Sequence, residues 1–196
     1  MSEHDEDLTR LGGFLKGASA ARTASTEPVE RRFIHRLPWL LVGLVGALLA
    51  ADIVGRFEHN LEQTVMLAFF IPGIVYLADA VGTQTETVVM RGLSVGITMR
   101  RMVLREILAG LAIGMSLAAV GGLLIWARWG DPTVALVVGV ALLGACSTAT
   151  FAAMLLPWVF SSFGRDPAFG SGPLATVIQD LLSITIYFAI ASAIIR

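Results

Sequence analysis

Apolar residues occur in five long runs that short polar segments separate. A transmembrane helix needs roughly 20 apolar residues in succession, and each run has about that length. The runs lack the alternation of apolar and polar residues, over roughly ten positions, that a membrane β-strand requires. The pattern therefore predicts five transmembrane helices, at about residues 37–55, 65–93, 102–126, 134–160 and 173–195.

The composition agrees with this interpretation, because 56% of the residues are hydrophobic and the mean hydropathy is +0.77. Both values exceed those of soluble globular chains. We expect an all-α integral membrane protein, with a five-helix transmembrane domain over residues 37–196. Residues 1–36 are polar and charged, and we expect them to form a disordered or amphipathic cytoplasmic segment. The acidic start of this segment differs from a secretory signal peptide.

Basic residues in the connections predict the orientation, because Lys and Arg are retained on the cytoplasmic side. Of the 14 Lys and Arg residues, all but Arg56, Arg128 and Arg196 lie inside if the N-terminus is inside. We therefore expect a cytoplasmic N-terminus, an external C-terminus and a multi-pass location in the cell (inner) membrane.

Two of the predicted helices carry acids within an apolar stretch. A carboxylate in hydrocarbon is costly, so it normally lines a water-filled path or has a partner, and no basic residue lies in the apolar body of any span. Helical spacing places these acids on polar stripes, which indicates two facing helices along a cation pathway. The stripes are Asp79, Thr83, Glu86 and Met90 in the second span, and Thr176, Asp180, Ser183 and Tyr187 in the fifth.

Each of these residues also has a structural interpretation. The threonines and Ser183 are suited to ordinary hydrogen bonds between helices. Asp180 could be a carboxylate that only holds helices together, and Glu86 could form a surface ion pair with Arg91, one turn away. Asp52 and Glu106, near the ends of their spans, are explained in the same way and are not assigned to the site.

Other ligand types are scarce in the predicted spans. Cys146 is the only cysteine, which excludes an intrachain disulfide or thiolate cluster and indicates a packing role. The three histidines, His4, His35 and His59, lie outside the spans, which argues against an imidazole metal site. A bound metal is therefore expected to have oxygen ligands, and neither an organic cofactor nor a nucleic-acid partner is expected.

Small residues recur every four positions in the third and fourth spans. Such stripes let helix backbones approach closely, so we expect them to serve the scaffold or a subunit contact. The stripes are Gly110, Gly114, Ala118 and Gly122 in the third span, and Ala141, Ala145, Ala149 and Ala153 in the fourth.

Three sequence motifs, over about residues 37–195, resemble the membrane domain of the MgtE magnesium channels. The first is Phe69-Phe-Ile-Pro72, and the second is Val81-Gly-Thr-Gln-Thr-Glu-Thr-Val-Val-Met-Arg91-Gly. The third is Asp166-Pro-Ala-Phe-Gly-Ser-Gly-Pro173-Leu-Ala-Thr-Val-Ile-Gln-Asp180, followed by Ile186-Tyr-Phe-Ala-Ile-Ala. The third is the most specific, because Asp-Pro-Ala, Ser-Gly-Pro and a later Asp occur together.

The resemblance implies a homodimer of five-helix subunits that transports Mg²⁺ through a path lined by the second and fifth spans. Asp180 corresponds to the metal-binding aspartate of the family, and Thr176, Gly82 and Thr83 correspond to neighbouring lining positions. The chain departs from the family at Asp79-Ala80, where Gly-Gly-Asn is usual, and at Glu86, where a small residue is usual.

Family members carry sensor domains before the membrane region, whereas about 36 residues precede the first span here. We therefore expect gating by the pore itself, by the basic segment 31–36 or by a separate regulatory protein. Membrane lipid is the other expected partner.

Taken together, these features predict transport of a divalent cation, with Mg²⁺ as the expected ion, and no enzymatic activity. Mg²⁺ keeps much of its water, which suits a pore with few acids. A proton-coupled secondary transporter of another cation or small molecule is the alternative, and a purely structural membrane subunit is a further one. An intramembrane aspartyl protease is disfavoured, because Asp79 and Asp180 lack the Tyr-Asp and Gly-x-Gly-Asp settings typical of that class.

Overall fold

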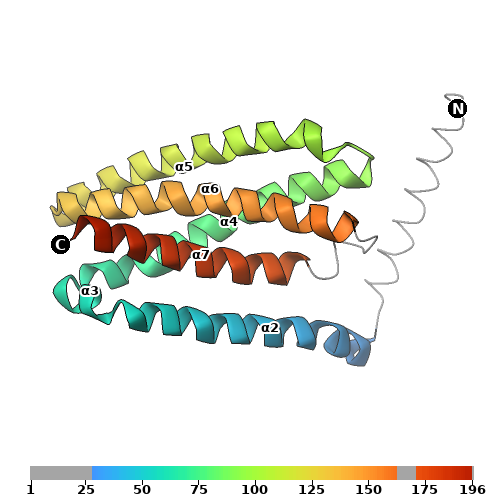
Figure 1. Cartoon of the computed structure of the whole chain (residues 1–196), viewed down its shortest axis with the longest axis horizontal. Coiled ribbons are helices and arrows are strands. Elements are labelled where there is room, and N and C mark those ends of the chain that lie inside the picture. Colours follow the sequence, from blue (N-terminus) through green and yellow to red (C-terminus); the bar gives the residue numbers. More distant parts are fainter. Residues whose placement is uncertain (1–27, 163–170, 196) are drawn as a thin grey trace, which may run out of the picture. The chain divides into compact units, whose positions relative to one another are not determined.

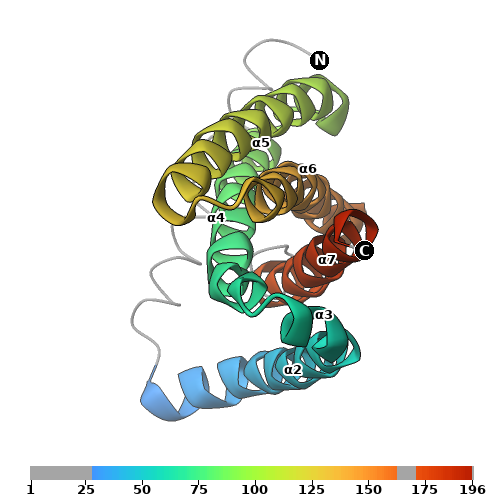
Figure 2. The same ribbon diagram turned by 90° about the vertical axis from the view of Figure 1, so that its left-hand side faces the viewer.

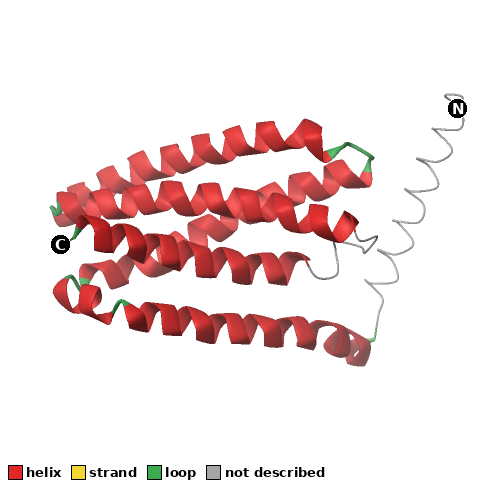
Figure 3. Ribbon diagram, in the orientation of Figure 1, coloured by secondary structure: helices red, strands yellow, loops and turns green. Residues whose placement is uncertain are grey.

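The computed structural model describes residues 28–162 and 171–195, and all regular secondary structure in these two ranges is helical (Figure 3). Five of the six helices in these ranges are long, whereas α3 has only six residues. Helix labels follow Figure 1. The helices are α2 (Val29–Arg56), α3 (Glu58–Gln63), α4 (Met66–Ser94), α5 (Met99–Trp129), α6 (Pro132–Ser162) and α7 (Ser171–Ile194).

Each of the five longer helices has the length and the apolar composition needed to cross a membrane, which confirms the predicted all-α membrane class. Their bounds agree with the predicted spans except at α2, which begins at Val29 and not near Leu37. An apolar run marks only the part of a helix that can lie in hydrocarbon, and here the helix extends through the basic segment before it. The short helix α3 was also not predicted, since its residues are polar.

Local sequence explains the tight connection between α5 and α6. Gly130 ends α5 in the left-handed region, with φ of 72°, where a side chain would be strained. Asp131 follows, and its carboxylate oxygen Oδ1 accepts hydrogen bonds from the backbone N–H groups of Thr133 and Val134, at 2.8 and 3.0 Å. Pro132 occupies the first helical position, where no N–H is needed. The two helices are therefore antiparallel neighbours.

The chain divides into two compact units, residues 1–40 and residues 41–196. The first contains the N-terminal part of α2. In the second, α6 packs against α4, α5 and α7, and α4 crosses behind α6 and α7 (Figures 1 and 2). The buried core of this unit comes mainly from α4, α6 and α7, with Ile125 added from α5, and Tyr187 and Phe188 are its largest side chains. Phe188 stacks on Phe57, with ring centroids 4.9 Å apart.

Small residues set the close contact between α5 and α6, as the spacing predicted. A Cβ added at Gly110 would meet the side chain of Thr150, and one added at Gly139 would lie 3.1 Å from the backbone oxygen of Ala118. The alanine stripe of α6 has a different role, since Ala141, Ala145 and Ala149 belong to the core shared with α4 and α7. Both stripes thus serve the scaffold of one protomer. Cys146 is buried and free, as expected for a packing residue.

Candidate functional site

The two helices that carry the predicted polar stripes, α4 and α7, contact each other directly. Within this contact, Gly82 of α4 lies against the side-chain amide of Gln179 of α7. Gln179 is only 2% exposed. A side chain at position 82 would displace this amide, so the glycine is what allows α7 to place a polar group against the backbone of α4.

The two intramembrane aspartates lie beside this contact. Asp79 precedes Gly82 by one turn of α4, and Asp180 follows Gln179 in α7. Both side chains are half-buried, and their carboxylates are close enough to interact electrostatically. Two like charges near each other in an apolar setting repel unless a cation or a proton lies with them. The fold therefore brings together the two acids that the sequence placed on different helices.

The remaining predicted ligands lie further along the same stripes. Thr83 and Thr176 are exposed on α4 and α7, and Glu86 is half-buried on α4, one turn after Thr83. Within the described parts of one protomer, no three His, Cys, Asp or Glu side chains form a cluster able to hold a metal ion. The assignment of Asp79, Thr83, Glu86, Thr176 and Asp180 as metal ligands thus stays a prediction.

Two predicted pore-lining residues occupy the interior of the protomer. Ser183 and Tyr187 are 1% and 0% exposed, and the Tyr187 hydroxyl donates a hydrogen bond of 2.8 Å to the backbone oxygen of Leu67. This bond joins α7 to the first turn of α4. In a single protomer Tyr187 therefore helps to hold α7 against α4, and lining of a shared path by Gly82, Ser183 and Tyr187 stays a prediction.

Sequence reasoning missed Gln179. Its amide oxygen Oε1 and the Asp79 oxygen Oδ1 are buried side-chain atoms for which the described residues supply no hydrogen-bond partner. A glutamine within an apolar run was a signal that could have been noticed, since a buried amide needs partners. It was overlooked because the carboxylate of Asp180, the next residue, costs more free energy to bury in an apolar span than an amide does.

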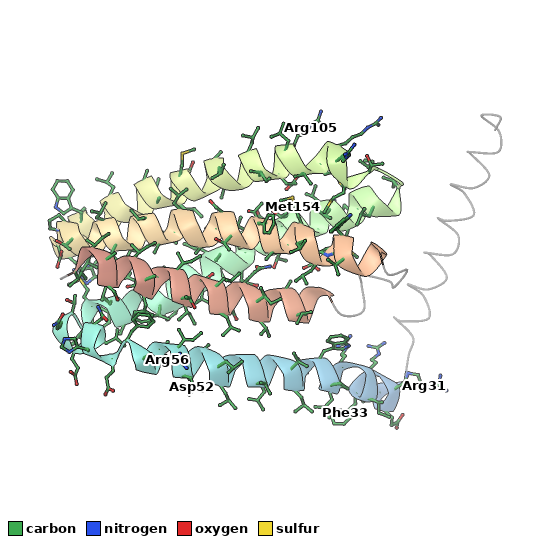
Figure 4. All side chains as sticks on the ribbon, in the orientation of Figure 1. Arg31, Phe33, Asp52, Arg56, Arg105 and Met154 are labelled. Atoms are coloured by element: carbon green, nitrogen blue, oxygen red, sulfur yellow. The ribbon has the colours of Figure 1, made fainter. Side chains whose placement is uncertain are left out.

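Two surface grooves lie elsewhere, between α5 and α6. One, of about 420 Å³, has Arg100 and Trp158 in its lining, and the other, of about 580 Å³, is lined by apolar residues. Neither is lined by an acid, so neither offers the oxygen ligands of a cation site. Figure 4 shows the side chains on the described helices, and Arg105 points outward from α5. The candidate site is therefore the α4–α7 contact.

The sequence is similar to that of known divalent cation transporters. A family model described as MgtE, divalent cation transporter, matches residues 71–190, which include the α4–α7 contact. The magnesium transporter MgtE of Bacillus subtilis is 36% identical over 100% of this chain and 43% of its own length. MgtE of Enterococcus faecalis is 36% identical over 82% of this chain, and MgtE of Thermus thermophilus is 29% identical over 84%.

The chain spans less than half the length of these relatives, between 36% and 43%. The family model nevertheless matches more than half of the chain, and it covers most of α4 and α7, including both aspartates. Five helices able to cross a membrane agree with the same assignment. The chain is thus a multi-pass membrane protein that belongs to the MgtE family of divalent cation transporters.

Proposed function

We propose that this protein transports Mg²⁺ across the cell membrane through a path between two copies of the chain, lined by α4 and α7. The observation that carries the proposal is the pair of half-buried aspartates, Asp79 and Asp180, which interact at the α4–α7 contact. No basic residue occupies the apolar body of a span to neutralise them. Acids in this setting are typical of ion paths.

The ligand chemistry favours a hard divalent cation. Carboxylate, hydroxyl and amide oxygens are the polar groups near the contact, and Mg²⁺ accepts one or two carboxylates while keeping several of its waters. The described residues of one protomer form no cluster of three acids. Two copies related by a two-fold axis would bring Asp180 and its symmetry mate to one ion, and each dimer would offer up to six acids from Asp79, Glu86 and Asp180.

Cross-linking tests whether α7 lines the dimer seam. Thr176 and Thr185 are both exposed on α7, and their spacing of nine residues places them on opposite faces of the helix. In a Cys146→Ala background, we expect Thr176→Cys to form a disulfide-linked dimer in oxidised membranes, because it lies on the stripe of Asp180. Thr185→Cys is the matched control and is expected to remain monomeric on denaturing gels. Equal cross-linking of the two variants would argue against the proposed seam.

Transport is expected to weaken as the pH falls. A carboxylate binds a cation only when it is ionised, so protons compete with Mg²⁺ for Asp180 and its neighbours. Mg²⁺ uptake into proteoliposomes, measured at equal internal and external pH, should be highest near neutral pH and decrease under acid conditions. Flux that rises in acid would contradict this mechanism.

The same assay separates the proposal from a proton-coupled transporter, which the two neighbouring acids would also permit. A coupled transporter moves protons together with its substrate or in exchange for it, so a pH gradient imposed at a constant Mg²⁺ gradient would drive or oppose its flux. The proposed pore needs only the gradient of Mg²⁺ and the membrane potential. Flux that depends on a proton gradient, at constant Mg²⁺ gradient, would favour the coupled mechanism.

A further inference from the structure

The α4–α7 contact contains two buried side-chain oxygen atoms, one from each helix. Asp79 Oδ1 on α4 and Gln179 Oε1 on α7 are both hydrogen-bond acceptors, and both lack a partner among the described residues. The Gln179 amide lies against Gly82, which is one turn of helix from Asp79. The two acceptors therefore belong to one small region inside the protomer.

Such a region requires a positively charged or donating occupant. A buried acceptor that has given up its water without gaining a partner destabilises the fold, and this is why buried polar groups are nearly always paired. The Asp180 carboxylate, next to Gln179, additionally experiences the charge of Asp79. The apolar bodies of the spans contain no Lys or Arg that could neutralise either carboxylate.

We propose that each protomer binds its own divalent cation between α4 and α7, through the carboxylate of Asp79 and the amide oxygen of Gln179. Both are hard oxygen ligands of the kind that Mg²⁺ and Ca²⁺ prefer, and Mg²⁺ fills its other positions with water. The amide adds a ligand without adding negative charge. Gly82 is part of the site, because the absence of its side chain leaves room for the amide.

This site rests on the proposed function in taking Mg²⁺ as the ion, and it adds a location that the shared path does not require. Gln179 is 2% exposed and lies inside the protomer, whereas the half-buried Asp180 lies next to it on α7. A cation held by Asp79 and Gln179 would offset the repulsion between Asp79 and Asp180. Each protomer would then hold an ion beside the path, and Asp180 would be available to the ion that moves.

Thermal unfolding of the purified full chain tests the site. A ligand that binds only the folded state raises the melting temperature as its concentration increases. We expect the wild-type chain in detergent to be stabilised by MgCl₂ in a saturable way. For Gln179→Leu and Asp79→Asn, the MgCl₂ concentration for half of this effect should rise at least tenfold. Asp180→Asn should lose only the contribution of an ion bound in the path and should keep the part of the response that Gln179→Leu removes, because Asp180 is not a ligand of this ion.

Two further variants separate a ligand from a packing residue. Gln179→Glu keeps an oxygen in place and adds charge, so it should retain or strengthen the response to MgCl₂. Gly82→Ala would displace the amide and should weaken the response, although the rest of the contact is unchanged. If Gln179 only packs, or only bonds to a trapped water, Gln179→Leu should melt at or above the wild-type temperature and respond to MgCl₂ as the wild type does.

Each result of the melting experiment either supports the proposed protomer site or overturns it. A wild-type chain that does not respond to MgCl₂, or a Gln179→Leu chain that responds equally, would overturn it. Loss of the response in Asp180→Asn would assign the ion to Asp180 and would also overturn a separate protomer site. The proposed transport function is judged by flux and not by melting. Unchanged flux in Asp180→Asn, with the melting results as expected, would reject the path and retain this site.

Discussion

Asp180→Asn is expected to reduce Mg²⁺ flux by roughly 100-fold, to near the level of protein-free liposomes, which corresponds to about 2.8 kcal/mol of lost interaction with the ion. The amide has nearly the shape of the carboxylate but lacks its charge. Asp180 lies in the apolar body of α7 beside Asp79, where the apolar setting makes its charge far more effective than a surface charge. The measurement is uptake of Mg²⁺ by proteoliposomes at a fixed gradient.

Asp52→Asn is the matched control for this substitution. Asp52 is an exposed acid near the C-terminal end of α2, labelled in Figure 4, and it was assigned a surface role from the sequence. The same chemical change there should leave the flux within about twofold of wild type, because exposed charges are screened. Equal loss of flux in both variants would show that net charge, and not Asp180, controls transport.

Gly110→Leu is expected to be the most destabilising of the proposed substitutions. A Cβ at position 110 would lie 2.8 Å from both Cβ and Cγ2 of Thr150, a buried residue whose branched side chain has little freedom to move. The two helices must separate to accept the larger residue, and overpacking of this kind costs about 1–3 kcal/mol. The measurement is the difference in the free energy of unfolding between the wild type and Gly110→Leu in mixed micelles.

The control uses the same change at an open position. A Cβ at Gly43 in α2 would meet no atom within 4 Å, so Gly43→Leu should alter the unfolding free energy by less than about 0.5 kcal/mol. Thr150→Ala should restore part of the stability of Gly110→Leu, because the two positions share one contact. If Gly110→Leu and Gly43→Leu were equally stable, the close approach of α5 and α6 would not be a source of stability.

The sequence alone determined the number of spanning helices and the presence of a carboxylate, Asp180, within the apolar part of one of them. Both follow from the cost of placing polar groups in hydrocarbon, which depends on the length of an apolar run and on a charge within it. Helical spacing also grouped Thr83 with Asp79, and Thr176 with Asp180, because residues three and four apart share a face of one helix. These inferences require no knowledge of the neighbouring helix.

The tertiary structure decided which faces meet. Spacing could not show that Gly82 contacts Gln179, that Tyr187 bonds to the backbone of Leu67, or that Gly110 of α5 faces Thr150. Such contacts depend on how two helices cross and on their offset along the membrane, and many offsets bury similar apolar area. Here close packing of side chains selects one of them. That choice places at the α4–α7 contact the oxygens of Asp79 and Gln179 for which the described residues supply no hydrogen-bond partner.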